Sequence, residues 1–206
     1  MKNFTKLIFS FTFSLMIITG AVYLTVAFKP LYYFDIGHLN ISESTGISKE
    51  EIRLNYDYMI DYNMSSDVGE FELPTIKSSV EGAIHFEEVR DIFQVVKNLF
   101  YISSVLSLIG GYFYIRNREF DVFRRVLIIL IVMPLVVAIP LIIDFNKSFI
   151  LFHEVMFSND YWIFDPKLDP VIRILPEEFF FHSGICILGI ILVSSMGLYK
   201  LSKKSM

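Results

Sequence analysis

The side chains best suited to acid–base chemistry in this sequence are its histidines, since imidazole takes and gives a proton near neutral pH. There are four of them: His38, His85, His153 and His182. His85 follows Glu81 by four residues and precedes Glu88 by three, so on a helix all three share one face. A carboxylate would then orient or charge the imidazole. A solvated acidic face on an amphipathic helix explains the same spacing, and spacing alone favours that simpler interpretation.

His153 stands in a segment crowded with aromatic residues. His153-Glu154 begins like the zinc motif HExxH, but the fifth position is Phe157, so that motif is absent. The neighbouring aromatic residues are Phe149, Phe152, Phe157, Tyr161, Trp162 and Phe164. An aromatic belt at a membrane interface explains many of them. A dry pocket around an acyl chain explains them equally well.

The remaining reactive side chains carry weaker signals. His182 follows Glu178 by four near the start of an apolar stretch, where an ionisable group is a functional candidate but also reaches water. His38 lies beside Gly37 and Asn40, and nothing singles it out. The single cysteine, Cys186, excludes an internal disulfide and has no neighbouring base. No phosphate-binding, dinucleotide, serine-hydrolase or repeated metal spacing is present, so the sequence predicts no cofactor and no metal.

The elements that position these residues are membrane helices. Of 206 residues, 54% are hydrophobic and 19% charged, which argues against a soluble domain, and a net charge of −4 gives no basic excess for nucleic acid. The apolar residues gather in blocks at 7–28, 92–114, 126–143 and 179–198. Each block is long enough to cross a hydrocarbon core of about 30 Å as a helix. The first is too long for a signal peptide and lacks a cleavage site, so we interpret it as an uncleaved span.

Lysine and arginine near the span ends predict the orientation. They gather at the start of the chain, in the loop 116–125 and at the end: Lys2, Lys6, Arg116, Arg118, Arg124, Arg125, Lys200, Lys203 and Lys204. The segments 29–91 and 144–178 hold 20 of the 22 acidic residues. Both termini are therefore predicted to be cytoplasmic, and these two segments, with all four histidines at or near them, extracytoplasmic.

The two outer segments are too small and too aromatic to form a free domain, so we expect them to pack as a cap. The predicted fold is an all-α membrane protein of four transmembrane helices with an extracytoplasmic cap, forming a single membrane domain over residues 1–206. Ser48 with Glu51 predicts one helix start, and Ser78 with Glu81 predicts another that runs straight into the second span. A short amphipathic helix is predicted over 147–157, and Pro176 with the acids after it predicts the start of the fourth span.

Two stretches resemble the lipoprotein intramolecular transacylases, a family of small bacterial membrane proteins. The first contains Phe152-His153, Phe157, Trp162, Asp165-Pro166, Asp169-Pro170, Leu175-Pro176-Glu177 and Phe179-Phe180. The second is Glu81…His85…Glu88-Val89, where the family pattern is His-Met-x-Asp-Val. Phe86 and Glu88 depart from that pattern conservatively, and Glu88 keeps the charge with a longer reach. The resemblance covers most of the chain.

The resemblance implies an acyltransferase of the bacterial plasma membrane whose active site faces outward. Its substrate would be a lipoprotein with a diacylglyceryl group on its N-terminal cysteine, and the acyl chain would move from the sn-2 ester to the α-amino group of that cysteine. His85 and His153 would be the catalytic pair. Supporting or substrate-binding residues would be Tyr33, Glu81, Glu88, Phe157, Trp162, Asp165 and Glu177. Membrane lipid is the other expected partner, and the protein is expected to be a monomer.

One imidazole would serve as base and the other as acid, and no acyl-enzyme is needed because amine and ester belong to one molecule. We expect Glu81 and Glu88 to raise the proton affinity of His85, which favours His85 as the base. The alternatives are an intermolecular lipoprotein acyltransferase or esterase, a non-catalytic accessory or envelope-stress sensor protein, and a metal-binding cap.

Overall fold

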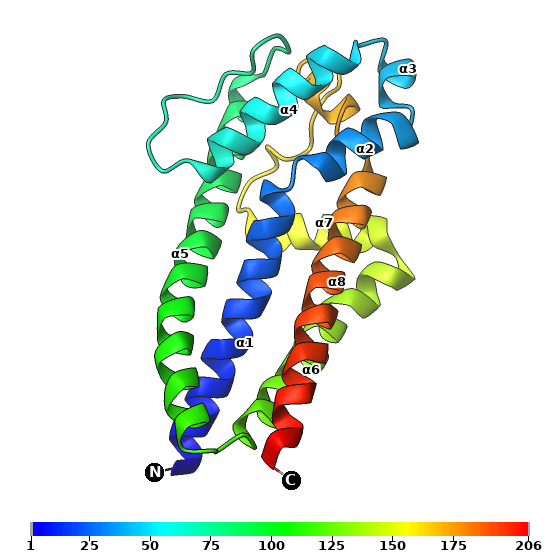
Figure 1. The fold of residues 1–206 in the computed structure, drawn as a ribbon. Helices are drawn as coiled ribbons and strands as arrows, with labels where there is room; N and C mark the ends of the chain where they lie inside the picture. The colour runs from blue at the N-terminus through cyan, green and yellow to red at the C-terminus, as the bar shows by residue number, and fades with distance from the viewer. Residues whose placement is uncertain (1, 206) are drawn as a thin grey trace. The chain divides into compact units, whose positions relative to one another are not determined.

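The computed structural model describes residues 2–205, so the first and last residues of the expected domain lie outside it. Figure 1 shows a chain made of helices, and no strand occurs among the described residues. The elements in chain order are α1 (Lys2–Ala27), α2 (Pro30–His38), α3 (Ile41–Thr45), α4 (Lys49–Met64), α5 (Val80–Arg116), α6 (Val122–Ile143), α7 (Phe145–Met156), the 3₁₀ helix η1 (Pro170–Arg173), α8 (Glu177–Ser202) and the 3₁₀ helix η2 (Lys203–Ser205).

Four helices are long and apolar enough to cross a membrane: α1, α5, α6 and α8. The prediction of an all-α protein with four transmembrane helices is confirmed. Helix α5 has 37 residues, or about 55 Å of helix, well beyond the roughly 30 Å of a hydrocarbon core. Its residues 80–91 hold five of its charged side chains, and its apolar stretch begins only at Ile92. His85 therefore precedes the part of α5 that is suited to lipid.

The chain divides into two compact units, and the first holds most of the apolar helix length: the residues up to Thr25, Val96–Ile143 and those from Ile185 onward. The ring of Phe9 on α1 lies 4.8 Å from that of Tyr114 on α5 and 6.0 Å from that of Phe123 on α6. Gly110 leaves α5 room for this contact, since a Cβ there would overlap the Phe9 ring. Lys6 binds Glu119 in the α5–α6 connection at 2.8 Å.

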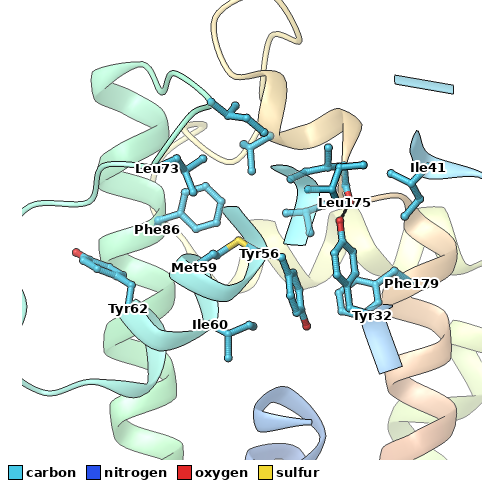
Figure 2. Close-up of a cluster of buried hydrophobic side chains, with 14 of the residues drawn as sticks. Tyr32, Ile41, Tyr56, Met59, Ile60, Tyr62, Leu73, Phe86, Leu175 and Phe179 are labelled. Atoms are coloured by element: carbon cyan, nitrogen blue, oxygen red, sulfur yellow. Dashed lines mark hydrogen bonds between the residues drawn. The ribbon is translucent and has the colours of Figure 1, made fainter. Parts of the chain in front are cut away.

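The second unit comprises Val26–Val95 and Asp144–Gly184 and contains the histidines. Figure 2 shows its core, in which the ring of Tyr32 on α2 stacks on Tyr56 of α4 at 3.7 Å. Phe179, at the start of α8, meets the Tyr32 ring edge-on at 5.0 Å. Met59 of α4 and Phe86 of α5 join the same cluster. The cluster thus joins α2, α4 and the first turns of α5 and α8.

Local sequence signals explain three helix starts in this unit. Ser48 caps α4, because its hydroxyl accepts a hydrogen bond from the Glu51 amide at 3.2 Å, as predicted. Asp144 caps α7 in the same way through the Lys147 amide at 3.1 Å. Helix α7 begins two residues before and ends one residue before the predicted 147–157, a difference within the usual fraying of helix ends. Helix α8 begins at Glu177, directly after Pro176, as predicted.

The predicted start of α5 is wrong by one residue. Ser79 is the cap, with its hydroxyl accepting from the Gly82 amide at 2.9 Å. Asp169, far along the chain, accepts hydrogen bonds from the Ser79 amide and hydroxyl, each at 2.7 Å. The Ser78 hydroxyl is buried and has no hydrogen-bond partner within residues 2–205. A tertiary contact to Asp169 therefore decides which of two adjacent serines begins the helix. The helix does run without a break from this cap into the apolar stretch, as predicted.

Candidate active site

His85 is placed by the packing of the residue beside it. Phe86 is buried in the core, with its ring 4.3 Å from Phe71 and 5.8 Å from Phe164, and this contact fixes the rotation of α5 about its axis. His85 is 5% exposed. Its ring meets Phe157 edge-on at 4.7 Å and Phe164 at 5.5 Å. The imidazole is thus enclosed mainly by aromatic carbon.

His153 comes from α7, and its ring lies 6.0 Å from that of His85. Its Nδ1 lies 2.7 Å from the Phe149 carbonyl oxygen, one turn earlier, which can only accept, so Nδ1 carries the proton. The lone pair is then on Nε2. Trp162 packs against the His153 ring at 4.9 Å, and Phe157 lies 5.6 Å away. Phe157 therefore contacts both imidazoles, and the structure brings together four of the predicted site residues.

Burial sets the charge of both histidines. Burial, with a smaller effect of the neighbouring His153, lowers the pKa of His85 to about 4. Burial also lowers the pKa of His153, against a smaller opposing effect of the hydrogen bond to Phe149. Both imidazoles are therefore neutral near pH 7. Each then offers one N–H donor and one lone pair, as paired proton transfer requires.

The expectation that Glu81 and Glu88 raise the proton affinity of His85 is wrong. Glu81 is exposed. Glu88 lies on α5 three residues after His85, but its Oε1 accepts a hydrogen bond from Asn159 Nδ2 at 2.7 Å. Desolvation of a ring enclosed by phenylalanines outweighs the field of carboxylates that make no hydrogen bond to it.

Several buried polar atoms near the histidine pair make no hydrogen bond within residues 2–205. They are Nδ1 of His85, Oε2 of Glu88 and Nε1 of Trp162. Buried polar groups are nearly always hydrogen-bonded, so each such atom needs an explanation. An unpaired carboxylate oxygen accepts and an indole N–H donates. Between them, these residues hold both an unpaired acceptor and an unpaired donor.

Three predicted site residues make their contacts elsewhere. Tyr33 donates its hydroxyl hydrogen bond to Asp57, and the Arg53 guanidinium lies over its ring at 4.8 Å. Asp165 accepts from the Lys167 amide at 2.9 Å within a turn. Glu177 accepts from Asn146 Nδ2 at 2.6 Å. These contacts hold loops and helix ends in place.

A second polar pair was not predicted from the sequence. His182 Nδ1 lies 2.9 Å from Oδ1 of Asp35, whose side chain is fully buried. The His38 ring lies 5.8 Å from that of His182 and stacks on Phe34 at 5.1 Å. The one available signal was an aspartate between aromatic and aliphatic residues of α2. Such a residue must find a partner when the helix is buried.

No group of three or more histidine, cysteine, aspartate or glutamate side chains suited to a metal ion occurs in the part of the chain that the structure describes. The metal-binding alternative therefore has no ligand set there. Cys186 is a free thiol on α8. The chemistry that the site supports is proton transfer to and from a bound molecule by two neutral imidazoles in aromatic surroundings.

The whole chain is similar to known membrane proteins. The family model described as lipoprotein intramolecular transacylase Lit matches residues 7–180. The solved structure of the membrane-integral transacylase Lit from Bacillus cereus is 37% identical, with 98% of this chain and 94% of that chain covered and a TM-score of 0.94. Two further structures of the Bacillus cereus protein carry H85R and H85A mutations in that protein's own numbering. They are 36% and 37% identical, cover 98% of this chain and 91% and 92% of theirs, and both have a TM-score of 0.89. A search of the curated proteins gave no match.

Proposed function

We propose that this chain, which belongs to the lipoprotein intramolecular transacylase family, moves the sn-2 acyl group of a diacylglyceryl lipoprotein to the α-amino group of the N-terminal cysteine. As a member of that family the chain is a membrane acyltransferase. The observation that carries the proposal is the pairing of His85 from α5 with His153 from α7 inside an aromatic enclosure.

The reaction is an isomerisation that needs only proton transfer and positioning. The amine nitrogen attacks the ester carbonyl carbon, a C–N bond forms, and the bond from that carbon to the glycerol oxygen breaks. The amine loses a proton and the glycerol oxygen gains one. Holding amine and ester within one confined site supplies several kcal/mol of the barrier reduction. No enzyme nucleophile is required, because both reacting groups belong to the same molecule.

The geometry supports His153 as the base and His85 as the donor. His153 Nε2 carries the lone pair, and the Phe149 carbonyl bound to Nδ1–H stabilises the imidazolium once it forms. The ring of His85 resists protonation, since burial lowers its pKa to about 4. A neutral imidazole still donates one N–H, which suits His85 to the developing charge on oxygen. This assignment reverses the one expected from the sequence.

The charge distribution of the loops supports a definite orientation. We propose that both termini and the α5–α6 connection face the cytoplasm of a bacterial cell, and that the histidine pair faces outward from its plasma membrane. Extracytoplasmic placement suits an enzyme whose substrate is an anchored, exported lipoprotein. The protein would act as a monomer and contact membrane lipid along its four apolar helices.

Tandem mass spectrometry of a synthetic diacylglyceryl lipopeptide, before and after incubation with the purified protein, tests the proposal. Intact mass does not change in an isomerisation, so the fragment spectrum decides. We expect an N-terminal fragment that carries one acyl amide at unchanged total mass. A gain of one acyl chain would instead mean intermolecular transfer, and a loss would mean an esterase. An unchanged spectrum from folded protein would favour the accessory or sensor alternative.

Single substitutions then test the residues. His85→Ala and His153→Ala should each lower the transfer rate by about 10²–10⁴-fold, the usual contribution of a general acid or base. His38→Ala is the matched control, because His38 is an exposed histidine stacked on Phe34 and should leave the rate unchanged. Full activity in a folded His153→Ala protein would remove it as the base.

A further inference from the structure

Glu88 has two carboxyl oxygens in different situations. Oε1 accepts a hydrogen bond from Asn159 Nδ2 at 2.7 Å. Oε2 is buried and has no hydrogen-bond partner within residues 2–205. Asn159 is itself held, because its Oδ1 accepts from the Tyr161 amide at 3.0 Å. The amide orientation is therefore fixed, and Asn159 supports one carboxyl oxygen while the other stays available.

An unpartnered buried carboxylate oxygen is energetically costly, because it has given up water without a replacement donor. An ionised carboxylate only accepts hydrogen bonds and is stabilised most by a cation that donates them. Glu88 forms no ion pair with a lysine, arginine or histidine of residues 2–205. A cationic donor small enough to reach a buried oxygen would satisfy Oε2. Glu88 lies one helical turn from His85, so such a donor would stand beside the histidine pair.

We propose that Oε2 of Glu88 binds the α-ammonium group of the substrate's N-terminal cysteine, and so selects lipoproteins whose amine is still free. This inference rests on the proposed function, which puts that ammonium at the histidine pair. An N-acylated lipoprotein has an uncharged amide in its place and would leave the carboxylate unpaired. Glu88 is then a specificity residue for the reaction.

The same interaction disappears when the reaction is complete. The bound ammonium gives up two protons in all: one passes to the glycerol oxygen and one to solvent by way of the imidazole that acts as base. The nitrogen of the product is an uncharged amide with a single N–H. Glu88 therefore holds the substrate more tightly than the product, which favours release of the product after each transfer.

Glu88 also has a structural role, and the test must distinguish this role from binding of the ammonium group. Its bond to Asn159 links α5, which carries His85, to the segment after α7, which carries His153. Glu88→Gln keeps an acceptor oxygen for Asn159 and nearly the same volume, but removes the charge. Glu88→Asp keeps the charge and shortens the reach. Glu154→Gln removes a carboxylate from the exposed residue next to His153, and is the matched control.

Binding of two unreactive probes to the purified full-length protein in lipid nanodiscs tests the inference without using activity. Both probes are lipopeptides in which ether links replace the glycerol esters, so no transfer occurs; one has a free α-amine and the other is N-acetylated. At mildly acidic pH, where the amine is charged, the wild type should bind the free-amine probe about 10- to 100-fold more tightly, the usual strength of a charge-assisted hydrogen bond. Glu88→Gln should reduce this ratio to near one, Glu88→Asp should restore most of it, and Glu154→Gln should keep it.

A wild-type ratio near one, or an unchanged ratio in a folded Glu88→Gln protein, would overturn the inference. If the glutamine variant does not fold, the pH dependence of the wild type decides. Its preference for the free-amine probe should vanish about two pH units above the amine pKa of about 8, where the ammonium is lost, and a preference that persists there contradicts the inference. If the wild type discriminates between the two probes but does not convert the ester lipopeptide, only the proposed function is refuted. If it converts the ester lipopeptide but binds both probes equally, only the role of Glu88 is refuted.

Discussion

Replacing Gly82 by alanine tests how the first turn of α5 is held. A Cβ at this position would lie 2.9 Å from Cγ of Asp169 and closer still to its Oδ1. That is well inside the roughly 3.5–4.0 Å at which carbon atoms attract one another. Neither the backbone at residue 82 nor the Asp169 side chain can move without a cost in free energy. Residue 82 is part of the helix, and Asp169 accepts both hydrogen bonds from Ser79. The alanine must therefore push the carboxylate off the helix start.

The magnitude follows from those two hydrogen bonds. A hydrogen bond to a charged group contributes about 1.5–3 kcal/mol, so losing both costs about 3–6 kcal/mol. The higher helix propensity of alanine stabilises the helix by about 1 kcal/mol relative to glycine. The net loss is about 2–5 kcal/mol, which corresponds to a fall in melting temperature of roughly 4–20 °C for a chain of this length. Transfer activity should fall as well, since His85 follows the displaced turn by one turn.

Thermal unfolding of the purified protein, followed by circular dichroism, measures the effect. Gly37→Ala is the control, because Gly37 is an exposed residue of α2 and a Cβ there would meet nothing within 4 Å. The control should melt at the wild-type temperature or slightly above it. Asp169→Ala removes the obstruction, so adding Gly82→Ala to it should cost almost nothing further. A Gly82→Ala protein that melts like the wild type would refute the reasoning.

Two further predictions concern buried ionisable groups. The pKa of His85 falls from its ordinary value of 6.5 to about 4 on folding, so between these pH values the unfolded chain binds more protons than the folded one. The free energy of unfolding is therefore unaffected by titration of His85 above pH 6.5 and decreases as the pH falls to about 4. The total decrease is at most about 3 kcal/mol. Melting curves near neutral pH and near pH 4.5 should show a smaller acid-induced loss for His85→Asn than for the wild type, and an equal loss would contradict the assigned pKa. Asp35 is fully buried against His182, so His182→Ala should cost about 3 kcal/mol by leaving a buried charge unpaired. Asp35→Asn in the same protein should recover part of that loss, and two purely additive substitutions would show that the pair is not coupled.

The membrane helices were predictable because lipid leaves the chain few choices. A backbone in hydrocarbon must satisfy its own hydrogen bonds, so an apolar block of about 20 residues can only be a helix. The cap of α4 was equally readable, because Ser48 bonds to the amide three residues away. Asp144 caps α7 with the same spacing, although the predicted start of that helix lay two residues later. Both signals are local, and nothing distant in the chain competes with them.

The start of α5 shows where local signals fail. Ser78 and Glu81 satisfy the capping-box spacing, but Asp169 binds Ser79, 90 residues away in sequence. The partnership of Asp35 with His182 spans 147 residues and has the same character. Such contacts depend on which helices pack together, and a single sequence does not encode that in any spacing.

The histidine pair was predictable in part, unlike the long-range contacts, but less completely than the membrane helices. Spacing alone favoured a solvated face for His85, whereas the ring is 5% exposed and enclosed by Phe157 and Phe164. The family resemblance named His85 and His153 together, and the structure puts their rings 6.0 Å apart. The charge state expected for His85 was wrong, because desolvation depends on aromatic neighbours that come from another part of the chain. Residue identity was predictable here, but residue environment was not.

The order of residues along α5 relates this environment to the lipid. His85 precedes Ile92, where the apolar stretch begins, by seven residues, or about 10 Å of helix. The polar layer outside the hydrocarbon core is only about 5–8 Å thick on each side. On the predicted topology and the proposed function, the substrate ester would therefore rise out of the core to meet the imidazoles, and the first carbons of its acyl chain would rise with it. Aromatic side chains around the pair would replace the lipid that those carbons leave, which would offset the cost of exposing them to water. The same rings keep both imidazoles neutral, so under the proposed function one arrangement of aromatic residues would serve both the acyl chain and the proton transfer.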